Sequence, residues 1–225
     1  MSAPLTGVPM AQYLAIKALS SGMCSRILTT SPLHAWIDSP WNEDREDDSS
    51  HASDIGTIAH DVLLEGGTGI IARIDPNDYP AEKTGAIPAG WTNKAIRAAR
   101  DKARAAGKIP LFPADIDRVT AMVESAQAYI AKSEIAGVFA TGAPEQVIQW
   151  DDGGVPCKAR PDWLNEEICL HLKTTKMSVS PPSFERTAIN MGYDISIEFY
   201  ARGINRPRHM ILAIEQEPPY ACKLF

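Results

Sequence analysis

Cysteine is scarce in this chain of 225 residues, and its cysteines are widely separated. None of them forms a C-x-x-C pair; the four are Cys24, Cys157, Cys169 and Cys222. A zinc knuckle built from such pairs is therefore not expected. Reduced thiols, as in a cytoplasmic protein, are the default expectation for cysteines spaced in this way.

Long apolar runs and several common catalytic motifs are also missing. No segment approaches the roughly 18 apolar residues that a membrane helix needs. The first residues lack the basic stretch and apolar run of a secretory signal. The sequence has no G-x-S-x-G elbow, no Walker loop and no dinucleotide glycine fingerprint. These absences predict a protein without a membrane role and disfavour hydrolases and nucleotide-binding enzymes of those types.

The charge is unevenly distributed along the chain. The formal net charge is −6, which argues against indiscriminate binding to nucleic acid. Residues 38–54 are strongly acidic, whereas residues 94–108 carry six basic residues and one acid. Arg97, Arg104 and Lys108 recur at helical spacing within the basic segment. They predict either a solvated helix face or a stripe that follows DNA phosphates.

The first part of the chain, residues 1–140, is predicted to be mostly helical. Apolar spacing and capping residues indicate helices, and one short strand, at these positions: short helices within 12–38, a helix at 54–65, a strand at 70–74, and helices at 92–106 and 114–136. Either Ser20 or Ser21 is suited to cap the second of the short helices. Residues 38–51 and 75–90 are predicted loops.

The second part, residues 141–225, is predicted to consist mainly of strands. Strand-like segments joined by tight turns surround one long helix: strands at 146–150, 155–164 and 168–172, a helix from Pro181 to about Arg202, and strands at 209–215 and 220–224. With a chain of this length, we expect one α/β domain over residues 1–225. Its core should be a mixed central sheet flanked by helices.

A predicted hairpin carries the most informative side chains. Asp162 ends its first strand, and His171 and Lys173 lie on its second strand. Residues i and i+2 of a strand share a face, so His171 and Lys173 should point the same way, beside Asp162. The carbonyl of Leu172 would be a further metal ligand. This is the layout of a PD-(D/E)xK metal site, except that His171 replaces an acidic residue. The pattern is short, and surface hairpins without a metal site often show it.

Further segments share the order and spacing of one family. They are Gly56–His60 with Leu63–Glu65, Cys157–Trp163, Leu172–Thr175, Gly192–Asp194 and Phe199–Tyr200. From about Ser20 to its end, the chain resembles the phage and prophage exonuclease VIII (RecE-type) branch of PD-(D/E)xK nucleases, relatives of lambda exonuclease and the RecB nuclease domain. Some relatives hold an iron–sulfur cluster on one early and three late cysteines, but this chain lacks the late group.

The resemblance implies a restriction-endonuclease-like core and roles for individual residues. His60 matches a helix histidine that binds metal, and Asp162 matches the central metal carboxylate. Lys173 matches the catalytic lysine, and Glu145 a further acidic ligand. Tyr200 matches a tyrosine that positions the DNA strand, although a core aromatic at helical spacing is an equal alternative. Arg160 and Ser196 are predicted to contact DNA.

Two positions depart from the family pattern. His171 stands where an aspartate is expected, and Ser196 stands where a glutamine precedes the tyrosine. A neutral imidazole binds Mn²⁺, Zn²⁺ or Fe²⁺ but is a poor ligand for Mg²⁺, which prefers oxygen donors. The sequence leaves three explanations open: a different metal, an impaired enzyme, or a change introduced to trap a complex.

The resemblance implies a metal-dependent DNA exonuclease of phage-type recombination in the cytoplasm of a bacterial host. It would resect linear duplex ends, 5′ to 3′, with two Mg²⁺ or Mn²⁺ ions. Its partners would be duplex DNA ends, a single-strand annealing recombinase and further copies of itself in a ring. A non-cutting DNA- or protein-binding module on the same fold is the alternative, because His171 and Ser196 replace two residues of the family's catalytic pattern. An acidic protein-interaction domain without a nucleic-acid role is a third hypothesis.

Overall fold

A computed structural model of the protein describes residues 4–45 and 54–225, so part of the acidic segment expected at 38–51 lies outside the described residues. Three short helices begin the chain, as predicted: α1 Met10–Ala15, α2 Ser21–Thr29 and α3 Pro32–Ile37. The hydroxyl of Ser20 caps α2 by accepting a hydrogen bond from the amide of Met23. Ser31 caps α3 in the same way through the amide of His34.

The helices of the middle segment begin close to their predicted positions, but the last of them ends at Ile130 and not at residue 136. They are α4 Asp54–Glu65, α5 Lys94–Ala105 and α6 Pro113–Ile130, with short 3₁₀ turns at Pro76–Asp78 and Val138–Ala140. Between them the parallel strands β1 Ile71–Arg73 and β2 Ile109–Leu111 form a small sheet. We did not predict β2, because three residues are too few to show an alternating pattern. None of the helices in the described ranges is long and apolar enough to cross a membrane.

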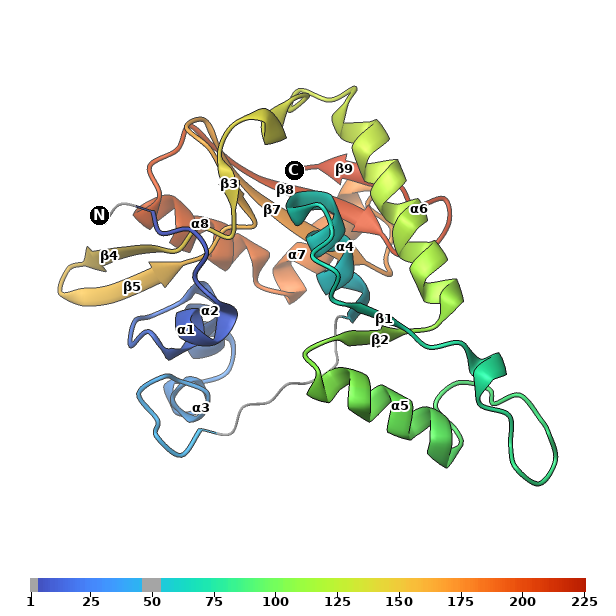
Figure 1. Ribbon diagram of the computed structural model, residues 1–225. Coiled ribbons are helices and arrows are strands. Elements are labelled where there is room, and N and C mark those ends of the chain that lie inside the picture. The colour runs from blue at the N-terminus through green and yellow to red at the C-terminus, as the bar shows by residue number, and fades with distance from the viewer. Residues whose placement is uncertain (1–3, 46–53) are drawn as a thin grey trace.

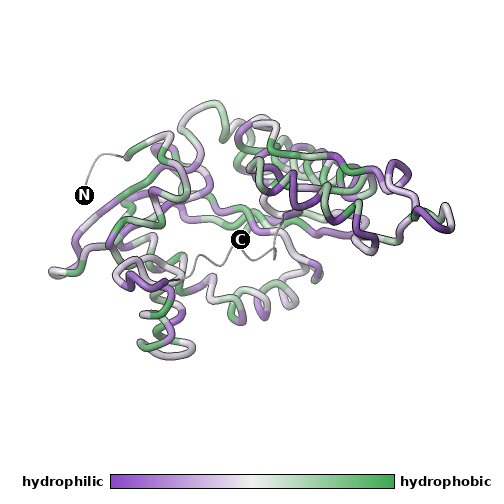
Figure 2. The backbone as a smooth tube through the Cα atoms, turned by 60° about the horizontal axis from the view of Figure 1, so that its bottom comes forward, coloured by the Kyte–Doolittle hydropathy of each residue, from purple (hydrophilic) through white to green (hydrophobic). Residues whose placement is uncertain are grey.

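A five-stranded mixed sheet forms the centre of the molecule (Figure 1). Its strands, in spatial order, are β3 Ala143–Pro144, β6 Trp163–Leu164, β7 Ile168–Thr175, β8 Arg208–Glu215 and β9 Cys222–Leu224. β7 and β8 are parallel, and the other neighbouring pairs are antiparallel. Figure 2 shows apolar residues in this central layer and also along the helices around it. The predicted mixed sheet flanked by helices is therefore confirmed.

Alternating side chains of β7 face two different helical layers. Leu170 and Leu172 pack with the apolar faces of α4 and α6. Cys169 packs on the opposite face with Phe199 of α8, and His171 contacts Tyr200 of the same helix. The face of β7 that carries His171 and Lys173 is thus the face turned toward α7 Pro181–Asn190 and α8 Tyr193–Gly203.

Two predicted elements are each divided in the structure. The strand expected at 155–164 ends at Ala159, so β4 Ile148–Asp152 and β5 Val155–Ala159 form a separate hairpin. Pro161 has no amide donor and lies in this break, which places Asp162 in a bend and not on a strand. The helix expected from Pro181 is also broken, because Gly192 has φ 65° and separates α7 from α8.

The segment 5–19 runs beside the β4–β5 hairpin and is bonded to it at both ends. Leu5 exchanges two backbone hydrogen bonds with Val147, and Leu19 bonds across to β5. Between these points the ammonium of Lys158, which is 2% exposed, donates to the carbonyls of three residues. These are Tyr13, Leu14 and Ile16, at 2.8, 3.2 and 2.8 Å. Lys158 therefore adds a charged donor to the carbonyls at the end of α1, two of which, those of Tyr13 and Ile16, also accept backbone amides.

Replacing Lys158 by methionine should lower the free energy of unfolding by about 2 kcal/mol, because buried carbonyls lose a charged donor. Urea unfolding followed by circular dichroism measures this loss. Lys132→Met is the matched control, since Lys132 is exposed and its replacement should change stability by less than about 0.5 kcal/mol. Equal stability of the two variants would show that Lys158 does not anchor the segment.

Candidate metal centre

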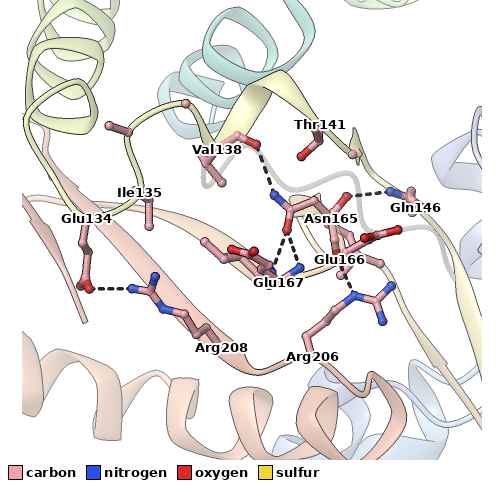
Figure 3. Close-up of a pocket in the computed structure, with 15 residues that line it drawn as sticks. Glu134, Ile135, Val138, Thr141, Gln146, Asn165, Glu166, Glu167, Arg206 and Arg208 are labelled. Carbon is pink, nitrogen blue, oxygen red and sulfur yellow. Dashed lines mark hydrogen bonds and ion pairs between the residues drawn. The ribbon is translucent and has the colours of Figure 1, made fainter.

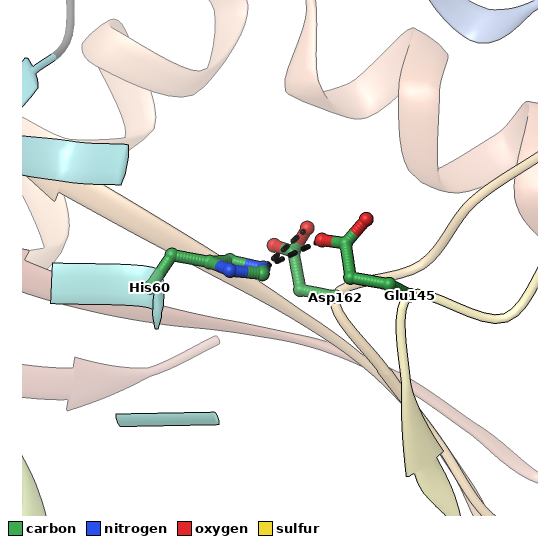
Figure 4. A group of neighbouring side chains, drawn as sticks. All are labelled: His60, Glu145 and Asp162. Carbon is green, nitrogen blue, oxygen red and sulfur yellow. Dashed lines mark ion pairs between the residues drawn. The ribbon is translucent and has the colours of Figure 1, made fainter. Parts of the chain in front are cut away.

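Three side chains from distant parts of the chain converge at one edge of the central sheet (Figure 4). His60 comes from α4, whose apolar residues, such as Ile58 and Leu63, face the core and leave His60 at the border of that face. Its Nε2 lies 2.9 Å from Glu145 Oε1 and 3.4 Å from Asp162 Oδ1. The ligand atoms of the three residues all lie within 4.8 Å of one another.

Glu145 is held in an uncommon backbone conformation just after β3. Its φ of 55° is in the left-handed region, and its amide donates to the carbonyl of Asp162 at 3.3 Å. One carboxylate oxygen faces His60, and the other forms an ion pair with Arg160. The backbone turn and the ion pair together direct this carboxylate toward the cluster.

Asp162 is fixed by the strand beside it. Its Oδ2 accepts a hydrogen bond from the amide of Leu172 at 2.5 Å and lies 3.8 Å from the ammonium of Lys173. Its other oxygen, Oδ1, is left to face His60. The Asp162 side chain is 16% exposed and that of Lys173 is 32% exposed, so the lysine can reach a ligand in the cavity.

The charges of the cluster stabilise one another. Burial alone would lower the pKa of His60, but its interactions with Asp162 and Glu145 raise that pKa to about 10. Burial alone would raise the pKa of Asp162, but Lys173, His60 and His171 hold it well below its usual range. The two neighbouring carboxyl groups therefore favour the protonated form of His60.

These residues fit a divalent cation. Nε2 of His60 is buried and makes no hydrogen bond of good geometry, although carboxylate oxygens lie nearby. A cation bound by one imidazole and two carboxylates would satisfy this atom. The cluster lines a cavity of about 320 Å³ together with Leu172 and Lys173. Within the described residues only this one group of three offers such ligands, so the two-ion count stays a prediction.

The structure places His171 near the cluster but outside it. Its side chain is 5% exposed and packs edge-on against Tyr200, with ring centres 4.5 Å apart. Its Nε2 lies 3.6 Å from the sulfur of Cys169. Burial lowers the pKa of His171 to about 4, so its imidazole is neutral at physiological pH. Its role as a metal ligand stays a prediction.

The other residues predicted on α8 lie beside His171. Tyr200 is 8% exposed, and its hydroxyl donates to the carbonyl of Arg160 at 3.3 Å. Ser196 donates to the carbonyl of Gly192 within its own helix. Both residues and His171 line a small cavity of about 140 Å³ next to the metal cavity, and Lys173 borders both cavities. Their contacts to DNA stay predictions.

The three predicted phosphate contacts do not share one helix. Arg97 is exposed on α5, but Lys108 lies beyond the end of that helix, since Gly107 has φ 71°. Arg104 forms an ion pair with Asp54 at 2.9 Å and thereby joins α5 to the beginning of α4. The common helical face is therefore a wrong expectation, although Arg97 and Lys108 remain exposed.

If this basic segment binds DNA phosphates, replacing Arg97, Lys102 and Lys108 by alanine should flatten the salt dependence of duplex binding. These three exposed residues have no ion-pair partner among residues 4–45 and 54–225. Each lost contact should reduce the slope of log K against log salt by about 0.9. Fluorescence anisotropy at several salt concentrations measures the slope. The control replaces exposed basic residues elsewhere: Lys83, Lys132 and Arg186.

A larger cavity than that of the cluster lies away from it, near the beginnings of β7 and β8 (Figure 3). It measures about 730 Å³, and its charged groups are largely paired with neighbours. Arg208 forms an ion pair with Glu134 at 2.7 Å, and Arg206 donates to the carbonyl of Asn165. It contains none of the predicted site residues.

Sequence reasoning missed how Arg160 and Met10 take part in the site. Arg160 was expected to contact DNA, but its guanidinium pairs with Glu145 and lies 3.2 Å from the sulfur of Met10. Met10 lines the metal cavity. No spacing rule connects these residues, because they are brought together by the break after β5 and by the segment 5–19.

Comparisons with known proteins agree with this geometry. Residues 38–225 match the family described as PDDEXK-like domain of unknown function (DUF3799). No curated protein has a matching sequence. A solved structure with a similar fold is that of a "Putative exonuclease" from Eubacterium rectale. It is 11% identical, with a TM-score of 0.53 over 98% of this chain and 78% of that chain. The RecE-type branch stays a prediction, but the chain belongs to the PDDEXK-like family and has the fold of PD-(D/E)xK nucleases.

Proposed function

We propose that the protein is a divalent-metal-dependent nuclease that degrades duplex DNA from its ends. The observation that carries this proposal is the convergence of His60, Glu145 and Asp162 with Lys173 at the border of the same cavity. Family membership and the exonuclease described for a protein of similar fold support the same reaction class. Resection in the 5′ to 3′ direction, a role in phage recombination and a ring-shaped oligomer are finer expectations, which rest on the resemblance in sequence.

His60, Glu145 and Asp162 would hold the cation, which when bound polarises the phosphate and lowers the pKa of a coordinated water. The ammonium of Lys173 lies 3.8 Å from Asp162 and 32% of its side chain is exposed, so it can reach both the attacking water and the phosphate. Its charge stabilises the negative charge that grows on the phosphate oxygens. Water adds to phosphorus, the P–O bond to the neighbouring nucleotide breaks, and a phosphomonoester and a free hydroxyl result.

The ligand set favours Mn²⁺ over Mg²⁺. Mg²⁺ prefers six oxygen ligands in octahedral geometry, whereas Mn²⁺ accepts an imidazole nitrogen more readily. His60 supplies such a nitrogen, and the neutral His171 adds no negative charge where the family pattern has a carboxylate. Mn²⁺ should therefore support the faster reaction.

End-labelled linear duplex and a covalently closed circle of the same sequence test this function. With Mn²⁺, the parent should degrade the linear duplex and leave the circle intact. His60→Ala should lower the rate about 10- to 100-fold, the range seen when metal sites lose supporting groups. His34→Ala, which removes an exposed histidine, should retain the parent rate. If the linear duplex stays undigested both with Mn²⁺ and with Mg²⁺, the proposal is contradicted.

A non-cutting DNA-binding module is the second candidate, favoured by the burial of His171 at 5% exposure against Tyr200. Such a module would shift labelled duplex in a gel without shortening it. Mn²⁺ would then change binding but produce no new fragments. If the duplex is neither cut nor shifted, the third hypothesis is favoured, that of an acidic protein-interaction domain without a nucleic-acid role.

A further inference from the structure

The segment 5–19 lies outside the residues that match the family, which begin at residue 38. It is nevertheless bonded to the part of the fold that carries the metal centre. Leu5 bonds to Val147, two residues after Glu145, and Leu19 bonds to both neighbours of Cys157 on β5. Met10, between these points, lines the metal cavity. A segment outside the family match thus contributes Met10 to the lining of the site.

Tyr13 is the centre of the contacts between this segment and the hairpin. It is 9% exposed, and its ring lies 4.8 Å from the ammonium of Lys158 and 6.0 Å from the guanidinium carbon of Arg160. Cations at such distances are attracted to the face of an aromatic ring. Lys158 also donates to the carbonyl of Tyr13, which ties the backbone of this residue to the hairpin.

Arg160 connects Tyr13 to Glu145. Its Nε faces both the carboxylate and, at 3.4 Å, the carbonyl of Glu145, and the arginine side chain is only 13% exposed. Its guanidinium also contacts Tyr13 and Met10 of the segment. A guanidinium enclosed in this way is poorly placed to bind a DNA phosphate but well placed to fix a carboxylate.

We propose that residues 5–19 are a functional part of the metal centre, because they hold Arg160 and Arg160 holds the Glu145 carboxylate in its metal-binding position. Arg160 is thus a positioning residue and not a phosphate anchor. Groups that orient metal ligands commonly change metal affinity about 10- to 100-fold when they are removed. This inference rests on the metal centre of the proposed function.

Tyr13→Leu tests the inference without changing any charge near the metal. Calorimetric titration of Mn²⁺ into the full chain should show about tenfold weaker binding than in the parent. Tyr129→Leu is the matched control; it removes a packed tyrosine on α6 that does not line the metal cavity, and Mn²⁺ affinity should stay within about twofold. Thermal melting without metal identifies any variant that fails to fold.

Arg160→Lys is the second variant, because lysine keeps the charge but cannot contact Glu145, Met10 and Tyr13 together. It should also weaken Mn²⁺ binding about tenfold, and its affinity for duplex in EDTA should equal that of the parent. Combining it with Tyr13→Leu should cause no further loss of Mn²⁺ affinity, because both changes disrupt the same chain of contacts from Tyr13 through Arg160 to Glu145.

Three results would overturn the inference: unchanged Mn²⁺ affinity in Tyr13→Leu, losses that multiply in the double variant, or weaker duplex binding by Arg160→Lys in EDTA. A parent that binds no Mn²⁺ would overturn the proposed function as well. A parent that binds Mn²⁺ through His60, combined with an unaffected Tyr13→Leu variant, would overturn this inference alone. Even if Tyr13→Leu does not fold, the Arg160→Lys measurements in Mn²⁺ and in EDTA decide between the two roles of Arg160.

Discussion

Replacing Lys173 by alanine should lower the rate of DNA cleavage by about 100- to 1,000-fold and leave duplex affinity within a few fold. Its ammonium lies beside Asp162 and borders the metal cavity, where negative charge grows in the transition state. An interaction made mainly in the transition state affects rate more than ground-state binding. Single-turnover digestion with excess enzyme measures the rate, and anisotropy without divalent ions measures the affinity.

Lys176→Ala is the matched control for this change. Lys176 is exposed just after β7 and is not among the residues that line the metal cavity. It should retain the parent rate. If Lys173→Ala instead loses duplex affinity and cleavage in equal proportion, Lys173 is a phosphate anchor, and its assigned role in the reaction is wrong.

Replacing His171 by aspartate should raise the Mg²⁺-supported rate at least about tenfold and change the Mn²⁺-supported rate much less. Residue 171 lies on the same face of β7 as Lys173, where the family pattern has a carboxylate. An aspartate there adds a hard oxygen donor and a negative charge, both of which Mg²⁺ favours. Parallel time courses of end-labelled duplex with each metal measure the two rates.

An aspartate at this position also replaces a buried neutral ring, so stability must be followed together with activity. His171→Asp should melt at a lower temperature than the parent without metal, because it buries a further carboxylate. Mg²⁺ should recover more of this loss in the variant than in the parent, since a bound ligand stabilises the folded state. Equal Mg²⁺-supported rates in both proteins would show that residue 171 is not a metal ligand.

The elements with strong local patterns could be predicted from the sequence. The residues of α4 were predicted from their apolar stripe and from the two glycines that follow Glu65, and the structure has the same bounds. The alternation along β7 predicted that His171 and Lys173 share a face, and β7 packs in this way. In both cases the pattern reflects contacts that each element makes along its whole length.

The parts that could not be predicted depend on contacts between distant residues. The break at Arg160–Asp162 interrupts a run that reads as one strand, and it is stabilised by hydrogen bonds to Glu145 and Tyr200. The left-handed conformation of Glu145 is uncommon for a residue other than glycine and leaves no local signal in the sequence. Arg97, Arg104 and Lys108 were expected to be able to share a helical face, because charge spacing alone does not show that Lys108 lies beyond the end of the helix.

Calorimetric titration of Mn²⁺ into the parent and into three single variants tests the central claim most directly. The variants are His60→Ala, Glu145→Gln and Asp162→Asn, each of which removes one ligand of the proposed centre. The parent should bind Mn²⁺, and each variant should bind it at least about tenfold more weakly while melting as a folded protein without metal. A parent without measurable Mn²⁺ binding, or three variants with the affinity of the parent, would contradict the account.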